Sequence, residues 1–487
     1  MNDRYTLMSM KTIKYLMIGA LMLGMSAPAM AQDAETKATI ESVTNIIKEQ
    51  PTNCEEQVKA VYKKNKKNAE VVLAIGRAYY DVKDTANAKT YAELAIKADK
   101  KYAKAFILLG DIEALNDNGG GAAGQYQQAI YFDPDDPEAY FKYASVYRKV
   151  SPTEAVAKLE ELRAHRPDVA VDALAGRIYY LSNDFDNAIE SYSKVSLSDM
   201  EDRDITEYAM ALYFTQQYQK SLEIAQYGLN KKPRDAAFNR LAFFNSTDLL
   251  DYEMALYYAD ALFNKSDSAK FSYFDYTYYG NALIGNNQPE EAIEAYKTAL
   301  TMEFDNKDKK AGVLKQLSEG YKGINDYDQA IATYREYMNT VSIVSGPDYV
   351  GLGYLYTIAA NDSVVTEEQK MEKLKGAEAV YNEMEEKMPQ YEEYTVYKKA
   401  QVNAMMDPET TEGLAKPYYE KLAGMLEPKE PLDDTDKVRL LECYRYLGYY
   451  NLLQNNEEEA NIYWNKILEI DPENSTAKKA LGLEAVE

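Results

Sequence analysis

Five times along this 487-residue chain, a glycine is followed twelve residues later by an alanine. An interval that recurs over several hundred residues is typical of a chain built by stacking one structural unit. In several places a proline follows after twelve further residues, as Pro134 follows Ala122. The glycine–alanine pairs are Gly76–Ala88, Gly110–Ala122, Gly176–Ala188, Gly280–Ala292 and Gly448–Ala460.

The residues around each glycine follow a helical period. Phe106, Leu109 and Gly110 share one stripe of a helix, and Ala122 and Tyr126 begin a second stripe after it. Two antiparallel helices approach closely only where side chains are small, and larger side chains then fill the space beside them. The proline ends the second helix. The unit is therefore predicted to be a helix, a turn and a second helix.

The unit resembles the tetratricopeptide repeat, a motif of about 34 residues with the pattern aromatic-x2-Leu-Gly-x2-Tyr, Ala-x3-aromatic, Pro. Residues 106–134 and 444–472 carry this pattern directly, and fainter copies occur elsewhere. The resemblance implies an all-α superhelical solenoid of about eleven helix-turn-helix repeats between residues 69 and 475, with terminal capping helices.

Residues 1–31 read as a secretory signal peptide. Lys11 and Lys14 precede an apolar run, and Ala29-Met30-Ala31 has the small-x-small pattern of a cleavage site. We therefore expect an exported protein of the bacterial periplasm or cell envelope, cleaved near Ala31. The apolar run is too short for a lasting anchor, so no integral membrane span is expected in the mature chain. Translation could begin at Met1 or Met10.

Three further segments follow from the spacing of the repeats. Residues 32–68 are predicted to form an N-terminal helical cap or degenerate repeat, and residues 69–340 to form repeats 1–8. Residues 341–487 are predicted to form divergent repeats 9–11, with insertions and a capping helix at 475–483. Thr366 and the acidic residues after it predict a longer second helix running to Lys387. The insertions at 357–376 and 402–414 either contact a partner or are tolerated surface loops.

The chain is acidic, with 79 Asp and Glu against 55 Lys and Arg and a net charge of −24. Such a charge disfavours nucleic acid and anionic lipid as partners. We expect Cys54 and Cys443, at opposite ends of the chain, to be buried thiols rather than a bridge within the chain or between chains. The glycine-rich run 116–121 is predicted to be a flexible turn between two helices.

The sequence predicts no catalytic site. His165 is the only histidine, and we expect it at the exposed end of a helix just before Pro167. It has no cysteine or histidine near it in the sequence, so no zinc site is supported, and no nucleophile motif surrounds it. Carboxylates are abundant, but they fall at the spacings of solvated helix faces. We therefore expect no enzyme activity, no metal and no cofactor.

The resemblance also implies a concave groove, lined by the first helix of each unit, that binds a peptide or protein partner. The groove positions of the first five units alternate Arg or Lys with aromatic residues, types that dominate binding hot spots. One hypothesis is a groove that prefers acidic segments. The alternative is that the arginines pair with neighbouring glutamates and the aromatics pack between repeats. The residues are Arg77, Tyr80, Lys104, Phe141, Arg148, Arg177, Tyr180, Arg203, Tyr213 and Phe214, and further along Asn239, Phe243, Asn281, Lys315, Tyr354 and Tyr449.

We therefore expect a non-catalytic scaffold or adaptor whose partner and oligomeric state the sequence leaves open. The alternative is a glycan-binding envelope protein, because the chain has 45 tyrosines against 12 phenylalanines. Tyrosine rings can stack against sugars as well as pack in a thin solenoid with the hydroxyl in water. The clusters that suggest this alternative are Tyr273, Tyr276, Tyr278 and Tyr279, and Tyr444, Tyr446, Tyr449 and Tyr450.

Overall fold

The computed structural model describes residues 27–483, with side chains from residue 34 onward, as two compact units that divide after Lys232. Within this part of the chain there are 25 α-helices and no strand. The predicted all-α solenoid of helix-turn-helix repeats is therefore confirmed. The expected signal peptide lies outside the described residues, apart from its last five.

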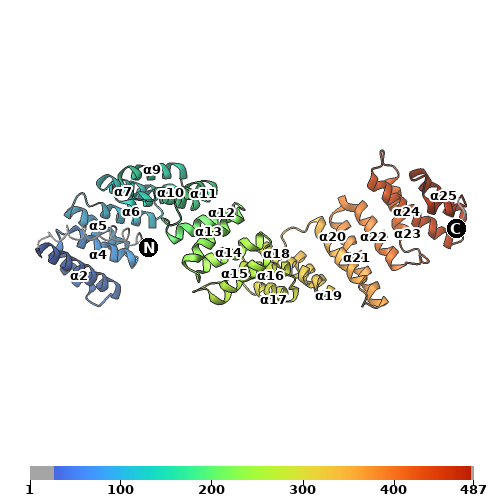
Figure 1. Ribbon diagram of the computed structural model, residues 1–487, viewed down its shortest axis with the longest axis horizontal. Helices are drawn as coiled ribbons and strands as arrows, with labels where there is room; N and C mark the ends of the chain where they lie inside the picture. The colour runs from blue at the N-terminus through green and yellow to red at the C-terminus, as the bar shows by residue number, and fades with distance from the viewer. Residues whose placement is uncertain (1–26, 484–487) are drawn as a thin grey trace, which may run out of the picture. The chain divides into compact units, whose positions relative to one another are not determined.

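Unit 1 consists of consecutive helix pairs, in which each first helix (the A helix) packs against the second (the B helix), and the B helix packs against the A helix of the next pair (Figure 1). Its first pair covers the predicted N-terminal cap. The pairs are α2 (Ala27–Glu49) with α3 (Cys54–Asn65), α4 (Ala69–Asp81) with α5 (Thr85–Ala98), α6 (Ala103–Leu115) with α7 (Gly119–Phe132), α8 (Pro137–Tyr147) with α9 (Pro152–His165), α10 (Val171–Tyr180) with α11 (Phe185–Ser193), and α12 (Asp202–Phe214) with α13 (Tyr218–Lys231).

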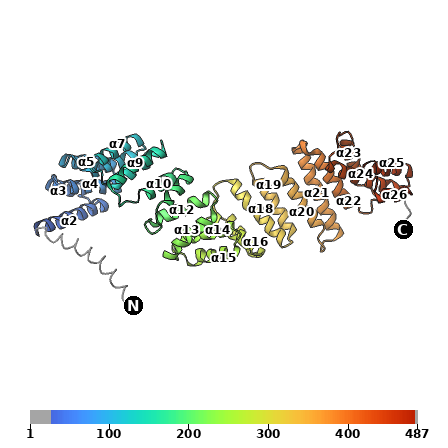
Figure 2. The ribbon, with the colours of Figure 1, turned by 45° about the horizontal axis from the view of Figure 1, so that its top comes forward.

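Unit 2 continues the same arrangement, and α18 to α21 lie side by side in Figure 2. Eleven pairs run from α4 to α25, the number that the repeat spacing predicts. The pairs of unit 2 are α14 (Ala236–Asp248) with α15 (Tyr252–Asp260), α16 (Tyr273–Gly285) with α17 (Pro289–Leu300), α18 (Lys307–Gly323) with α19 (Tyr327–Thr340), α20 (Gly346–Ala360) with α21 (Glu367–Lys387), α22 (Glu392–Met406) with α23 (Lys416–Leu426), and α24 (Asp434–Leu453) with α25 (Glu457–Ile470), followed by α26 (Ser475–Ala480).

The turn between the A and B helices has one geometry in eight repeats. A residue with positive φ lies just beyond the C-cap of the A helix, and the N-cap residue of the B helix follows it directly. In the first of these turns Lys83 has φ 66°, and the Asp84 carboxylate accepts a hydrogen bond from the Asn87 backbone N–H at 3.0 Å. Such a cap satisfies a helix N–H group that has no partner within the helix. The positive-φ residues are Lys83, Asp117, Asn183, Gln216, Leu250, Asn287, Asn325 and Asn455.

In several helix pairs, a glycine of the A helix makes room for a ring on the B helix. A Cβ placed on Gly110 would lie 2.4 Å from the Tyr126 ring, and one on Gly176 would lie 2.8 Å from the Tyr192 ring. Each of these rings comes four positions after the alanine that follows the glycine by twelve residues, so the alanine and the ring share one face of the B helix. At Gly76 no ring intervenes, and the backbone of α5 itself comes within 3.1 Å of the added Cβ. The glycine therefore sets how closely each helix pair packs.

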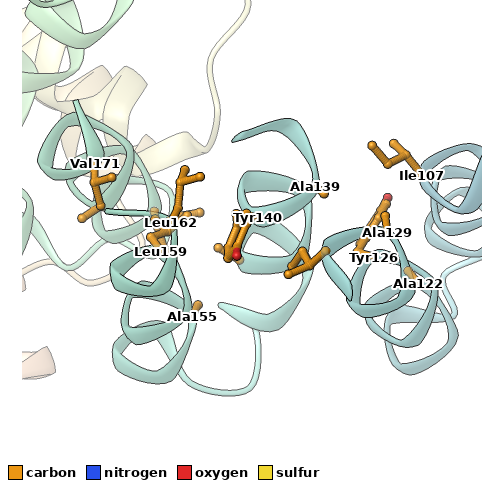
Figure 3. Close-up of a cluster of buried hydrophobic side chains, with 14 of the residues drawn as sticks. Ile107, Ala122, Tyr126, Ala129, Ala139, Tyr140, Ala155, Leu159, Leu162 and Val171 are labelled. Carbon is orange, nitrogen blue, oxygen red and sulfur yellow. The ribbon is translucent and has the colours of Figure 1, made fainter. Parts of the chain in front are cut away.

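One core cluster of unit 1 extends from α6 to α10. Tyr126 and Tyr140 are both fully enclosed, at 2% and 1% exposed, and alanines occupy the points where the helices come closest. Figure 3 shows these side chains pointing toward one another from neighbouring helices. A cluster of this kind buries apolar area at every repeat, so each repeat depends on its neighbours.

Two segments test the local predictions from the sequence. The long second helix of repeat 9 is confirmed: α21 begins after the Thr366 N-cap and ends at Lys387. The glycine-rich run contains the predicted turn between two helices at 116–118, but its three glycines belong to the helix that follows and not to a flexible turn. Asn118 accepts a hydrogen bond from the Gly121 backbone N–H at 3.0 Å, and α7 begins at Gly119. The cap fixes the first helical turn despite the freedom of glycine.

The other predicted segment boundaries remain predictions. The division after Lys232 separates two compact units and does not mark where the repeats become irregular. Pro428 and Pro431 lie in the connection between α23 and α24, as expected of a linker, and α26 forms part of the predicted terminal helix.

Asp348 joins two consecutive repeats at the start of α20. Its carboxylate accepts hydrogen bonds from the Ser345 backbone N–H at 2.9 Å and from the Tyr337 hydroxyl at 2.6 Å, and it pairs with Lys315 at 3.0 Å. Burial alone would raise the pKa of Asp348. The hydrogen bonds of Ser345, Tyr337 and Lys315 outweigh this penalty and lower the pKa from 3.8 to about 2.

We expect unit 2 to lose stability as the pH falls from about 4 to about 2, because of Asp348. A carboxyl group whose pKa is lower in the folded state stabilises the fold above its unfolded pKa, and that contribution is lost as the pH falls through the folded value. Urea midpoints measured between pH 6 and pH 2 should show a steeper decline for the unaltered chain than for Asp348→Asn. Parallel curves would contradict the assignment.

Candidate functional site

The A helices of unit 1 carry the predicted groove residues, and we call the surface formed by the A helices the A-helix face. Arg77 and Lys142, from different repeats, both pair with Asp111 of α6, at 2.5 and 2.6 Å. Asp111 is 5% exposed and also accepts a hydrogen bond from the Tyr126 hydroxyl at 2.9 Å. Arg77 is thus part of a network that joins three repeats.

Arg177 is the most enclosed of the ten groove residues predicted in unit 1. Its guanidinium donates to Asp204 at 3.0 and 2.6 Å and to Glu201 at 3.0 Å, and it lies over the Phe141 ring at 5.5 Å. Arg177 is 8% exposed and Asp204 is 3% exposed. Arg203 in turn bonds Glu207 at 2.7 Å, and Glu207 also accepts from a buried tyrosine. These contacts match the alternative in which arginines pair with acidic residues of the solenoid.

Arg148 and Lys104 differ from these paired cations. Among the described residues, neither has a carboxylate within ion-pair distance. Arg148 donates from Nη1 to the Leu181 carbonyl oxygen at 2.7 Å, and its buried Nε has no hydrogen-bond partner. Lys104 is exposed. Of the predicted cations, these two remain available to an acidic segment, and their role in binding stays a prediction.

The predicted aromatic residues of unit 1 are mainly packed. The Tyr180 hydroxyl contacts Met210 Sδ at 3.4 Å, and the Tyr213 ring lies 5.6 Å from a neighbouring tyrosine ring. Phe214 packs on Phe185 at 5.0 Å yet keeps 50% of its surface exposed. The Tyr80 ring lies beneath the Lys83 ammonium at 5.7 Å.

Two groove positions expected further along are not on the surface. Phe243 is 0% exposed and Asn239 is 2% exposed, inside α14. The Asn239 amide donates to the Pro233 and Asp235 carbonyl oxygens and to Ser266, so it is a structural residue of the loop before the helix. The assignment of these two positions to an exposed groove was wrong, because Phe243 stands twelve residues before Ala255, at the buried position that glycine has in other repeats.

Unit 2 contains a pocket of about 500 Å³ on its A-helix face, which the sequence did not reveal. It spans α20, α22 and α24, with two tyrosines contributed by B helices. Tyr354, one of the predicted groove residues, lines it and is 56% exposed. Its walls are mainly aromatic and apolar: Val350, Tyr354, Tyr381, Tyr394, Val402, Met405 and Tyr419.

Polar side chains form a short row across this pocket. Lys398 Nζ donates to Gln401 Oε1 at 3.0 Å, and Gln401 Nε2 lies 3.4 Å from Glu442 Oε1. Glu442 also accepts from the Tyr419 hydroxyl at 2.8 Å and the Tyr397 hydroxyl at 3.0 Å. Burial lowers the pKa of Lys398. Spacings of three and four on α22 put Lys398 and Gln401 on one side, but the opposite wall comes from residues more than forty positions away.

The histidine, the cysteines and the carboxylates are the residues that could support catalysis or bind a metal. No group of three or more His, Cys, Asp or Glu side chains in residues 34–483 is placed to hold a metal ion. His165 ends α9 with 45% of its side chain exposed, 3.5 Å from Asp135. Cys443 is buried as predicted, and burial raises the pKa of its thiol, whereas Cys54 is half-buried.

Helix length and apolarity also bear on membrane insertion. Among the helices of the described residues, none combines the length and apolar character needed to cross a membrane.

Two family models of the tetratricopeptide repeat match the chain, over residues 73–137 and 276–306. Together with the consecutive helix pairs, these matches identify a tetratricopeptide repeat protein. Proteins of this class generally act as non-catalytic scaffolds that bind other proteins. A comparison with curated protein sequences finds no match.

Several solved structures are similar to parts of the chain. The C-terminal part of a TPR repeat-containing protein from Cytophaga hutchinsonii is 23% identical, with a TM-score of 0.44, over 57% of this chain and 99% of that one. A tetratricopeptide repeat protein from Parabacteroides merdae is 17% identical, with a TM-score of 0.35, over 52% and 98%. PilF of Pseudomonas aeruginosa is 19% identical, with a TM-score of 0.33, over 41% and 93%.

Proposed function

We propose that this protein is a non-catalytic scaffold or adaptor of the bacterial periplasm or cell envelope, and that it binds a partner polypeptide on its A-helix face. The signal-like pattern of residues 1–31 supports export. The tetratricopeptide repeats support protein binding. In this proposal the partner contacts the faces of several consecutive repeats at once.

One observation carries the choice of surface: the aromatic pocket of unit 2 opens onto the A-helix face beside an exposed tyrosine. Tyrosine and methionine are enriched in protein interfaces, where they bury large areas. In unit 1 the same face keeps Arg148 without a carboxylate partner among the described residues. Both units therefore present groups that a partner chain can bury or pair.

The proposal predicts that a photoreactive amino acid at Tyr354 cross-links a specific partner in cells of the native host. The matched control is Tyr257, which is 62% exposed on the B helix α15. Mass spectrometry should identify a protein adduct from position 354 that is missing from position 257. Identical adducts from both positions, or adducts from neither, would overturn the proposed surface.

No contact among the described residues favours the glycan alternative. Tyr276 and Tyr279 pack against Phe263 at 5.1 and 5.3 Å, and Tyr273 and Tyr444 are 5% and 4% exposed. Rings that are covered by protein offer no open face to a sugar. Our proposal therefore covers protein binding alone.

A further inference from the structure

The pocket of unit 2 is lined by a partly buried cation, Lys398. Lys398 has no carboxylate within ion-pair distance among the described residues, and its ammonium lies 5.7 and 5.4 Å from the rings of Tyr394 and Tyr397. The adjacent Lys399, by contrast, is buried and paired with Glu385. Burial lowers the pKa of Lys398, which is the expected effect of removing water from an ammonium group. An anion brought by a ligand would replace the stabilisation that water gives to an exposed ammonium group.

The pocket's own carboxylate acts on Lys398 from a distance but does not pair with it directly. Glu442 accepts hydrogen bonds from two tyrosine hydroxyls and lies beside the Gln401 amide, which separates it from Lys398. Its oxygens are therefore supplied with donors already, and it has no need of a cation from a ligand. The pocket is asymmetric: one end can accept an anion, and the other is satisfied internally.

The rest of the pocket suits an apolar group next to that anion. Val350, Tyr354 and Met405 line it, and its volume of about 500 Å³ is within the usual range for ligand pockets, about 300–1,000 Å³. Tyr354 is 56% exposed, so the pocket communicates with the open A-helix face. A long segment of chain can therefore lie across α20, α22 and α24 with one or two side chains in the pocket.

We propose that this pocket binds an acidic-apolar segment of the partner polypeptide, whose carboxylate pairs with Lys398 while a neighbouring apolar side chain packs between Tyr354 and Met405. The inference rests on the proposed function and names the chemistry that the scaffold recognises. In a chain with a net charge of −24, a cation without a carboxylate partner is a selective feature. A carboxylate that pairs with it gains a charge-assisted hydrogen bond in partly desolvated surroundings.

A peptide series tests this inference on the full chain. Fluorescent heptapeptides carry one glutamate at the centre, flanked by Leu, Phe or Ala in all combinations, and each has a counterpart with glutamine. We expect the glutamate peptides with Leu or Phe to bind about tenfold more tightly than their glutamine counterparts in fluorescence anisotropy. Equal affinities for the two sets, or no binding by any member, would overturn the inference.

Variants assign the preference to the pocket. We expect Lys398→Gln to abolish the preference for glutamate and Lys398→Arg to retain it. Lys437→Gln, an exposed lysine on α24, is the control and should leave the preference intact. Unchanged thermal unfolding, followed by circular dichroism, verifies that each variant is folded. A glutamate preference that persists in Lys398→Gln would overturn the assignment.

Two further measurements separate the possible failures. If free phenylacetate displaces the peptides at equal concentration, the site binds a small acid and the assignment to a polypeptide is wrong. The Tyr354 cross-linking experiment is repeated in the Lys398→Gln background, where we expect the partner adduct to be lost. An undiminished adduct would overturn this inference while leaving the scaffold function intact, whereas no adduct from either chain would overturn the scaffold function itself.

Discussion

Gly110→Ala is expected to destabilise unit 1 by about 1–3 kcal/mol, because the added methyl group overpacks a core position. Its Cβ would lie 2.4 to 2.9 Å from three carbons of the Tyr126 ring, closer than any ordinary contact. The ring cannot move aside easily, because Tyr126 is 2% exposed and its hydroxyl is held by Asp111 at 2.9 Å. Urea unfolding followed by circular dichroism should show a lower midpoint.

Gly124→Ala is the matched control for this substitution. Gly124 is in the interior of α7, in the same repeat, and an added Cβ meets nothing within 4 Å. Removing a glycine from an open helical position should stabilise the fold by up to about 1 kcal/mol. The two variants therefore shift the midpoint in opposite directions. A shift in the same direction would show that helix propensity, rather than the ring, governs position 110.

Arg177→Ala is expected to cost about 3–5 kcal/mol, the usual consequence of leaving a buried charge without its partner. Asp204 is 3% exposed, and among the described residues its one ion-pair partner is Arg177, at 2.6 Å. Burial already raises the pKa of Asp204, and loss of the guanidinium should raise it further. The variant should therefore regain part of its lost stability below neutral pH, which urea midpoints at several pH values will measure.

Two controls give this expectation a clear interpretation. Arg166→Ala removes an exposed pair with Asp168, and we expect no resolvable shift of the midpoint. The double variant Arg177→Met with Asp204→Leu replaces both charges by apolar groups and should recover most of the loss. If the double variant is as unstable as Arg177→Ala, shape rather than charge is the cause. Loss of partner binding in Arg177→Ala would in either case reflect a damaged fold.

The sequence predicted the fold well because the residues that repeat are the residues that pack. Glycines, alanines and caps recur at fixed intervals, so the helix pairs and even the long helix ending at Lys387 could be placed without a structure. The role of the ring at Tyr126 was missed because the glycine was paired with the nearer alanine. The three glycines of the run 116–121 were assigned to the turn, whereas the Asn118 cap places them in the first turn of α7.

The candidate site was harder to predict because its contacts join different repeats. Arg77 and Asp111 are 34 residues apart, and Lys315 and Asp348 are 33 apart. A search for opposite charges one repeat apart would have found these pairs, whereas spacings within a single helix could not. Neither charge pairs one repeat apart nor spacings within one helix predict the pocket at Lys398, because its walls come from five helices.

The ion pairs between repeats also mean that the repeats are not interchangeable. Arg77 and Asp111 occupy the same position in consecutive units, directly after the glycine, and they attract each other at 2.5 Å. Duplicating the first of these units would place arginine against arginine, and deleting the second would remove the carboxylate that Lys142 also needs. The packing residues are alike in these units, but the ion pairs require a particular repeat on each side. The order of these three repeats therefore matters, because deleting the second one would remove both pairs.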